Sequence, residues 1–349
     1  MNKFKKIFLV VLSVVSCSLF AEENQKEKIN APFVFSFVGN EFYGFSGKDV
    51  TADFAVGMLG STLYQVNVFQ ASSLYNVTHE LDGAQIAGIF NLNANEAAGF
   101  QGAGIFNINS GDLNGTQLAG IFNANSGNLF GFQGAGIVNY AGGEDSDGVQ
   151  VAGILNINNG NLKGSQVGLI NLCAGDCDFQ FGLINISKNG IIEFGTSYTS
   201  NDTFRYSFTS GKKYFYAVLG LMSDNPFRDG NILKQEFYSN FESFGGFGTR
   251  LSLGMFNLDF QALYNNVFFK NSNDESTTAG YLSGRVAGGI TPIKHLNIFA
   301  GYSAGFEHPG YCDSDLAFDH KTSHLKTKFD NGLTIHHEIE VGIKFCLND

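Results

Sequence analysis

The sequence predicts an all-β fold with two architectures in series: an N-terminal β-solenoid of about seven 16-residue coils, followed by an antiparallel β-barrel-like domain. The first supporting observation is composition, since the 349 residues include 44 Gly and 36 Phe but only 4 Pro. Glycine penalises helix interiors, and aromatic residues favour strands. The other two observations are a tandem repeat in the first half of the chain and long segments of alternating polar and apolar residues in the second half.

Charge and hydrophobicity limit the classes of partner. Hydrophobic residues make up 44% of the chain, which is enough to bury a large core. The formal net charge is −11, and the sequence contains no basic stripe. Such a chain would repel a phosphate backbone, so nucleic acid is not expected as a partner.

Residues 1–21 have the pattern of a secretory signal peptide, with a basic start, an apolar run over 7–15 and a short segment that ends at Ala21. The apolar run is too short to span a bilayer as a helix. Cleavage after Ala21 is expected, and it would release an exported protein. A second interpretation takes residues 14–17 as a lipoprotein signal, which would leave Cys17 as an acylated N-terminus.

A linker with one short β segment is expected over residues 22–80, and the tandem repeat then covers 81–195. Each of its seven units places a glutamine, a glycine and an asparagine at matched positions, and successive glutamines are 16, 16, 16, 17, 16 and 14 residues apart. The glutamines are Gln85, Gln101, Gln117, Gln133, Gln150, Gln166 and Gln180. The asparagines are Asn91, Asn107, Asn123, Asn139, Asn156, Asn171 and Asn185.

The pattern inside a unit is that of strands. Alternate residues from Gln117 to Asn123 point to opposite faces of an extended chain, and Asn-Gly and Ser-Gly pairs supply turns. A period of 16 suits one solenoid coil with two strands and two turns, in which equivalent residues stack about 4.8 Å apart. We expect glutamine and asparagine to form ladders of amide hydrogen bonds, and the Ile and Phe positions to form a continuous core.

The alternative is that each unit supplies one strand of an antiparallel sheet or barrel. Its difficulty is the identical register of the amides, because antiparallel neighbours do not place identical side chains opposite one another along a whole sheet.

Two of the units, Gly99–Asn107 and Gln166–Asn171, carry a resemblance to a known family. They resemble the tandem repeats of a bacterial surface-repeat family found in Gram-negative phyla, including spirochaetes and Bacteroidetes. The order of segments is also similar, with a short β segment at Pro32–Phe37 before the repeats and a segment like Phe208–Tyr216 opening a β-rich tail. The match covers residues 32 to about 222. It implies a surface or envelope location and a repeat architecture, and it implies no biochemical activity.

Residues 196–349 are predicted to form the antiparallel barrel or barrel-like domain. Apolar residues alternate with polar ones over 250–262, 282–287 and 339–345, in segments of the length that membrane strands need. About eight such segments are present, which is enough for a small closed barrel. The alternation fits a membrane barrel with its apolar face outward. It fits a soluble barrel or sandwich with that face inward equally well.

Four cysteines would remain after export. Cys173 and Cys177 are close enough in sequence for a local disulfide in an oxidising compartment, and unlinked thiols are the alternative. The pairing of Cys312 and Cys346 is left open. No histidine neighbours the first pair, so a metal site is not expected there.

The sequence offers no convergent catalytic site, metal site or cofactor motif. His320 and His324 would share a face only on a helix, yet their surroundings are those of a polar loop. His336 and His337 point to opposite faces of a strand. The Gly-x-Gly patterns belong to the repeat, where close packing explains them.

We therefore expect a non-enzymatic cell-envelope protein with a structural or adhesive role, exported to the outer membrane or cell surface of a Gram-negative bacterium, with the periplasm as the alternative location. The expected partner is the outer membrane or an envelope polymer such as a glycan, bound through the repetitive amide face. The alternative function is an outer-membrane β-barrel for transport or pore formation. An extracellular hydrolase ranks third.

Overall fold

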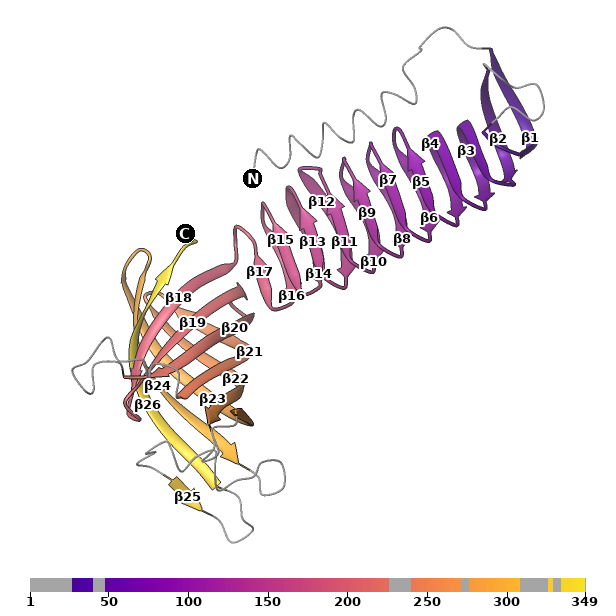
Figure 1. The fold of residues 1–349 in the computed structure, drawn as a ribbon. Helices are drawn as coiled ribbons and strands as arrows, with labels where there is room; N and C mark the ends of the chain where they lie inside the picture. Colours follow the sequence, from indigo (N-terminus) through magenta and orange to yellow (C-terminus); the bar gives the residue numbers. More distant parts are fainter. Residues whose placement is uncertain are drawn as a thin grey trace, which may run out of the picture. The chain divides into compact units, whose positions relative to one another are not determined.

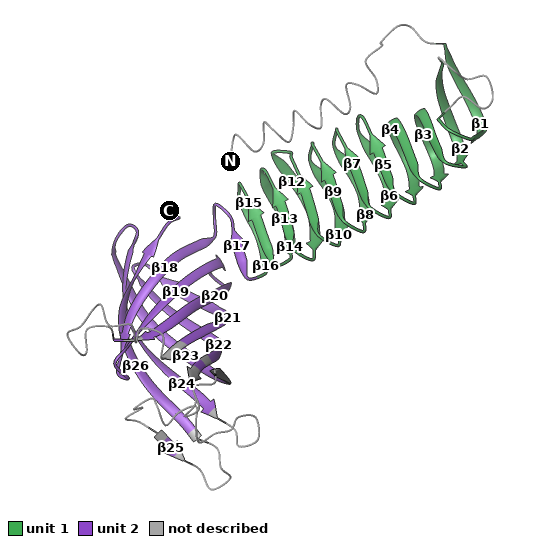
Figure 2. Cartoon of the chain, viewed as in Figure 1, with its two compact units in different colours: residues 1–182 green, residues 183–349 purple. Residues whose placement is uncertain are grey.

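A computed structural model describes residues 27–39, 48–225, 240–270, 276–307, 326–328 and 334–348 of the protein. The predicted signal peptide, Cys17, Cys312 and three of the histidines, including His320 and His324, lie outside the described residues. The chain forms two compact units, residues 1–182 and 183–349 (Figure 2). All described elements are strands, so the all-β prediction is confirmed, and no helix in the described part of the chain could cross a membrane.

The N-terminal architecture is a parallel 17-stranded sheet wound into coils (Figure 1). Its strands are β1 (Lys28–Ser36), β2 (Asp49–Gly57), β3 (Gly60–Ser72), β4 (Tyr75–Ala87), β5 (Phe90–Asn93), β6 (Ala97–Ala103), β7 (Phe106–Asn109), β8 (Leu113–Ala119), β9 (Phe122–Asn125), β10 (Leu129–Ala135), β11 (Val138–Ala141), β12 (Asp145–Ala152), β13 (Leu155–Asn158), β14 (Asn161–Val167), β15 (Ile170–Cys173), β16 (Cys177–Phe181) and β17 (Ile184–Ile186). The coils confirm the predicted solenoid.

One coil consists of a longer strand, a Gly-Ile or Gly-Leu turn, a four-residue strand and a polar turn. In the coil of β8 and β9, Gln117 pairs in parallel with Gln101 of the preceding coil and with Gln133 of the following one. Asn123 pairs in the same way with Asn107 and Asn139. This parallel, in-register pairing excludes the alternative in which each unit is one strand of an antiparallel sheet.

The parallel stack also begins before the repeat region. Residues from Lys28 onward, which were expected to form a linker with a short β segment, contribute β1 to β4. β3 and β4 each run through a short-strand position and the next long-strand position without a break, as the pairings of β4 with both β5 and β6 show. The repeat signal misses these coils because their ladder positions hold Ala55, Gln70, Ser61 and Asn76 rather than a regular Gln and Asn pattern.

The predicted core of Ile and Phe is wrong. The side chains that point into the coils are the amides and one apolar column, which includes Leu81, Leu113, Leu129 and Leu162. In the Gly-Ile turns Ile105, Ile121, Ile137 and Ile154 are exposed, and the phenylalanines of the short strands are half-buried on the outer surface. The error lay in assigning the apolar positions to the inside, although alternation alone does not say which face is buried.

Glycine is required at two columns because neighbouring coils lie so close. Gly115 has φ +152°, and a Cβ there would lie 1.9 Å from the carbonyl oxygen of Gly99. In the turn before the short strand, a Cβ on Gly104 would lie 2.1 Å from the oxygen of Gly88. The glycines of the repeat are therefore a consequence of coil stacking, as expected from their fixed spacing.

The second unit contains an antiparallel barrel. Its strands are β18 (Ile191–Thr199), β19 (Thr203–Lys212), β20 (Phe215–Asp224), β21 (Asn240–Leu253), β22 (Phe256–Lys270), β23 (Ser276–Ile293), β24 (Leu296–Glu307) and β26 (Thr334–Cys346). Each strand pairs with the next, and β26 pairs with β18, so the eight strands close into a ring. A short strand, β25 (Lys326–Lys328), pairs with β26 beside the ring. The predicted barrel of about eight strands is confirmed.

The two ends of the barrel differ in their connections. At one end, two-residue turns at 213–214, 254–255 and 294–295 join the strands. At the other end, the connections after β20, β22 and β24 are longer. Ile191 pairs with Gly211 and Cys346 with Glu193, so the barrel both begins and ends at the short-turn end.

Candidate functional site

The seven predicted glutamines lie in one buried column inside the solenoid. Each has no accessible surface. Each side-chain nitrogen donates to the side-chain oxygen of the glutamine one coil earlier. The Gln117 nitrogen donates to Gln101 at 2.7 Å, and the Gln133 nitrogen donates to Gln117 at 2.9 Å. Such a chain of aligned amides polarises each of its members, which strengthens the individual hydrogen bonds.

The asparagines form a second column, which also ties the short strand of each coil to the long strand of the next coil. The Nδ2 of Asn107 donates to Oδ1 of Asn123 at 2.9 Å and to the carbonyl oxygen of Leu118 at 2.8 Å. The first bond runs along the stack, and the second crosses to a long strand. The same pair of bonds recurs at Asn91, Asn123, Asn139 and Asn156. Asn185 is buried at the end of this column.

A third amide column was missed by the sequence analysis. Asn109 donates through Nδ2 to Oδ1 of Asn125 at 2.6 Å and to the carbonyl oxygens of Gly111 and Asp112, so it closes the polar turn of its coil. Asn93, Asn125 and Asn158 close their turns in the same way. The signal was the Asn-x-Asn spacing of these units, because the second asparagine follows the first at the interval that returns to the same face.

Cys173 and Cys177 do not form the predicted disulfide, and both are buried thiols in the structure. Cys173 occupies the column of the third set of asparagines, where its thiol donates to the Gly160 oxygen at 3.2 Å. Cys177 occupies the apolar column and pairs with Leu162. The two side chains belong to different inward columns, which explains why closeness in sequence does not join them.

Burial decides what the ladders can do. Because the three amide columns are enclosed and bonded to one another, they present no hydrogen-bonding groups to a polymer. The outer face of the short strands instead carries a stack of rings, with centroids 5.0 Å apart for Phe90 and Phe106 and 4.9 Å apart for Phe106 and Phe122. Tyr140 lies on the same face, where burial raises the pKa of its phenol above 10.0 and keeps it neutral. The amide ladders therefore stabilise the solenoid rather than bind a ligand.

The wall of the barrel is apolar on its outside. Along β22, Leu258, Phe260 and Tyr264 face outward and are exposed, whereas Asp259 and Gln261 face inward and are buried. β26 follows the same rule, with Ile339 and Val341 outward and Glu338, Glu340 and Lys344 inward. Of the two orientations left open by the alternation, the structure has the one with polar residues inside.

Buried ion pairs fill the interior of the barrel in two groups. In the first, Arg205 contacts Glu338 at 2.9 Å and Glu340 at 3.4 Å, and Arg285 pairs with Glu340. In the second, Arg250 binds Glu193 and Asp259, each at 2.6 Å, and Lys344 pairs with Asp259. A buried charge is tolerated only when it is paired and hydrogen-bonded, and these groups meet that condition.

Apolar and aromatic side chains occupy more of the interior. Tyr216, Met222, Phe244 and Leu263 belong to one buried cluster inside the barrel. Phe299 lies beneath two cations, with Arg285 at 5.2 Å and Lys344 at 5.0 Å from its ring centroid. An eight-stranded barrel has an interior that side chains can fill, and this barrel is of that kind.

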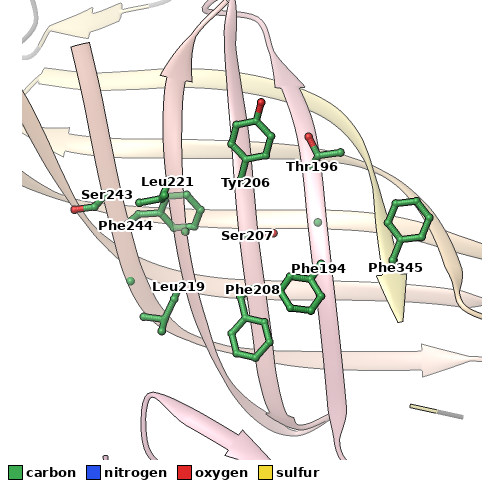
Figure 3. Close-up of a pocket in the computed structure, with 13 residues that line it drawn as sticks. Phe194, Thr196, Tyr206, Ser207, Phe208, Leu219, Leu221, Ser243, Phe244 and Phe345 are labelled. Atoms are coloured by element: carbon green, nitrogen blue, oxygen red, sulfur yellow. The ribbon is translucent and has the colours of Figure 1, made fainter. Parts of the chain in front are cut away.

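A groove of about 800 Å³ lies in the outer wall over β18 to β21 and the end of β26 (Figure 3). The outward side chains around it are Phe194, Tyr206, Phe208, Leu221 and Phe345. Small residues at Thr196 and Gly245 leave the space between them. Its lining is almost wholly apolar, so the groove is suited to a hydrocarbon chain.

The described residues contain no group of three or more His, Cys, Asp or Glu side chains that could hold a metal ion. His336 points into the barrel and His337 outward, as their neighbouring positions on one strand require. The comparisons with protein-family models, curated proteins and solved structures found no match for this chain. The resemblance to a surface-repeat family therefore remains a prediction.

Replacing Gln117 with Ala tests the internal ladder. The change removes the bond to the Gln101 oxygen and one of the two bonds of the Gln133 nitrogen, and it opens a cavity, so it should destabilise the solenoid by about 2–4 kcal/mol. Asn114→Ala is the matched control, because Asn114 is exposed on the same strand. Thermal unfolding followed by circular dichroism should show a lower melting temperature for Gln117→Ala alone. Equal melting of both variants would contradict an internal ladder.

Replacing Glu340 with Gln tests the interior network of the barrel. The neutral amide removes the charge that balances Arg205 and Arg285, so the variant should lose about 3–5 kcal/mol of stability. Urea unfolding of the full chain measures the loss, with Ser252→Ala, at an exposed position of the same barrel, as control. A Glu340→Gln protein with the wild-type urea midpoint would show that the pairs contribute nothing.

Proposed function

We propose that this is a non-enzymatic protein of the outer membrane of a Gram-negative bacterium, in which the C-terminal barrel is a membrane anchor and the solenoid is a rigid rod with a structural role. The observation that carries the proposal is the inverted barrel, which is apolar on its wall and charged inside. In water this arrangement would expose the side chains that most favour burial. In a bilayer the same apolar wall contacts the hydrocarbon of the lipids, which is favourable.

Three further features support membrane insertion. The alternating two-residue turns and longer connections are typical of outer-membrane barrels, which have short periplasmic turns and longer extracellular loops. Closure between β18 and β26 leaves no unpaired edge in the ring, as hydrocarbon requires. The apolar wall groove beside Phe194 and Phe345 has the chemistry to take a lipid acyl chain.

The filled interior favours an anchor over the alternative of a transport or pore protein. Ions cross a barrel through a hydrated lumen, whereas here Arg205, Arg250 and Arg285 are held against carboxylates and rings. Opening a hydrated path would require these arginine side chains to move, which would break their buried ion pairs. We infer that the barrel does not conduct.

Chain order supports one side of the membrane as the location of the solenoid. The barrel begins at Ile191, at the short-turn end, and the solenoid precedes it directly in sequence. Short turns of outer-membrane barrels face the periplasm. We therefore propose that the rod lies in the periplasm, which makes a structural role within the envelope better supported than adhesion at the cell surface.

An arginine on the wall tests insertion. Val286 faces outward in the central part of β23, and Arg there should cost about 2–4 kcal/mol in a bilayer. Leu253→Arg, beside the two-residue turn, is the control and should cost at most about 1 kcal/mol. Folding into lipid vesicles, followed by the heat-modifiable band on gels, should fall for Val286→Arg only.

Wild-type protein in planar bilayers should give no stepwise conductance. Steady conductance would restore the pore alternative, and recovery of folded, monodisperse wild-type protein from buffer without detergent would contradict the membrane anchor itself.

Cysteine labelling tests the side of the rod. Asn114 is exposed on the solenoid, and Ser200 is exposed in the turn at the end opposite the short turns. In a background with Cys312→Ser and Cys346→Ser, a membrane-impermeant maleimide should label Ser200→Cys on intact cells. It should label Asn114→Cys only after the outer membrane is permeabilised. Labelling of Asn114→Cys on intact cells would place the rod at the surface instead.

A further inference from the structure

One edge of the solenoid is an uninterrupted apolar surface that the proposed function does not use. The second residue of each turn between a long strand and the following short-strand position forms a column along the stack: Leu59, Leu74, Ile89, Ile105, Ile121, Ile137, Ile154 and Leu169. Ile121 and Ile137 are each 41% exposed, and Ile154 is 46% exposed. Apolar side chains flank the column on both sides, with Leu118 and Val151 on the long strands and Phe106 and Phe122 on the short strands. We call this surface the apolar edge.

The apolar edge is rigid. Backbone bonds link its residues from coil to coil, since the nitrogen of Ile121 donates to the oxygen of Ile105 at 2.9 Å and the nitrogen of Ile137 donates to that of Ile121 at 3.0 Å. The stacked rings of Phe90, Phe106 and Phe122 fix its neighbouring face. A preordered surface loses little entropy when it binds.

Charge lies on the other edge. The polar turns there carry Glu96, Asp112, Glu144 and Asp176. This acidic rim argues against an anionic lipid surface as the occupant, because such a surface would be attracted by lysine and arginine. Glycans are also disfavoured. Sugars stack on ring faces, and the faces of these rings are covered by one another, at interplanar angles of 2° and 8°.

The size of the apolar edge fits a second copy of the chain. Eight positions at about 4.8 Å per coil give a length of about 34 Å. The chain from Leu118 to Phe122 spans at most about 13 Å at about 3.3 Å per residue, and side chains that extend about 3–4 Å on each side bring the width to about 20 Å. Two such faces would bury about 1,300 Å² in total, which lies within the range of stable, specific interfaces. Identical faces have the same 4.8 Å period, so the two columns stay in step along the whole contact.

We propose that two copies of the protein associate through the apolar edges of their solenoids in an isologous, two-fold interface. The acidic rim remains outside and limits assembly to a pair. Ile121 is close to the middle of the column. It faces its own counterpart if the rods are parallel, and it lies near the axis if they are antiparallel and fully overlapped.

Cysteine cross-linking of the full chain in lipid vesicles, in the Cys312→Ser and Cys346→Ser background, tests the pairing. Ile121→Cys should form a disulfide-linked dimer under mild oxidation at least about ten-fold faster than Asn114→Cys, which is also exposed but lies away from the apolar edge. Adding Ile137→Lys to Ile121→Cys should abolish the fast cross-link, and an unchanged melting temperature will show that the rod is intact.

Equal rates for Ile121→Cys and Asn114→Cys would overturn the proposal, and so would fast cross-linking that survives Ile137→Lys. Either result leaves the membrane anchor untouched, because insertion of the barrel is measured separately.

Discussion

Buried polar groups that satisfy one another are the constraint on which both units depend. In the solenoid, the glutamine column places an amide every coil where most proteins would place a hydrocarbon side chain. In the barrel, four cations and their carboxylate partners occupy the interior. An unsatisfied amide costs about 1–3 kcal/mol, and an unpaired charge costs more, so removing one member of the glutamine column or of an ion-pair group should destabilise that interior. The register of neighbouring strands is therefore fixed more strictly than in a core of hydrocarbon side chains.

The buried polar groups of the two units are satisfied in different ways. The ladder uses identical neutral groups, which bond to copies of themselves because the coils are parallel and in register. The barrel is antiparallel and cannot stack identical residues, so it pairs opposite charges from strands distant in sequence, as with Arg205 and Glu340. With polar groups inside, apolar residues remain for the outside. That outer surface is the basis for both proposals, a barrel wall that faces lipid and an edge at which two solenoids pair.

Much of the fold could be predicted from the sequence, because the spacing of a repeat indicates the length of its structural unit. The spacing of Gln101, Gln117 and Gln133 gives the coil, and the alternation around Asp259 gives the barrel strands. The direction of the faces could not be predicted, since alternation is symmetric with respect to inside and outside. That symmetry is why Ile121 was assigned to a core that it does not join. The ion pairs could not be predicted either, because Arg250 and Glu193 are far apart in sequence and come into contact only in the closed barrel.

The measurement that tests the account most directly uses the absence of tryptophan from the chain. A single Trp can be placed on the wall by Phe260→Trp or inside the barrel by Phe299→Trp, since Phe260 is exposed and Phe299 is buried. In vesicles whose acyl chains carry bromine, which quenches indole fluorescence on contact, the Phe260→Trp protein should be strongly quenched and the Phe299→Trp protein should not. Equal emission from both proteins in brominated and ordinary lipid would contradict a barrel that turns its apolar wall to the membrane.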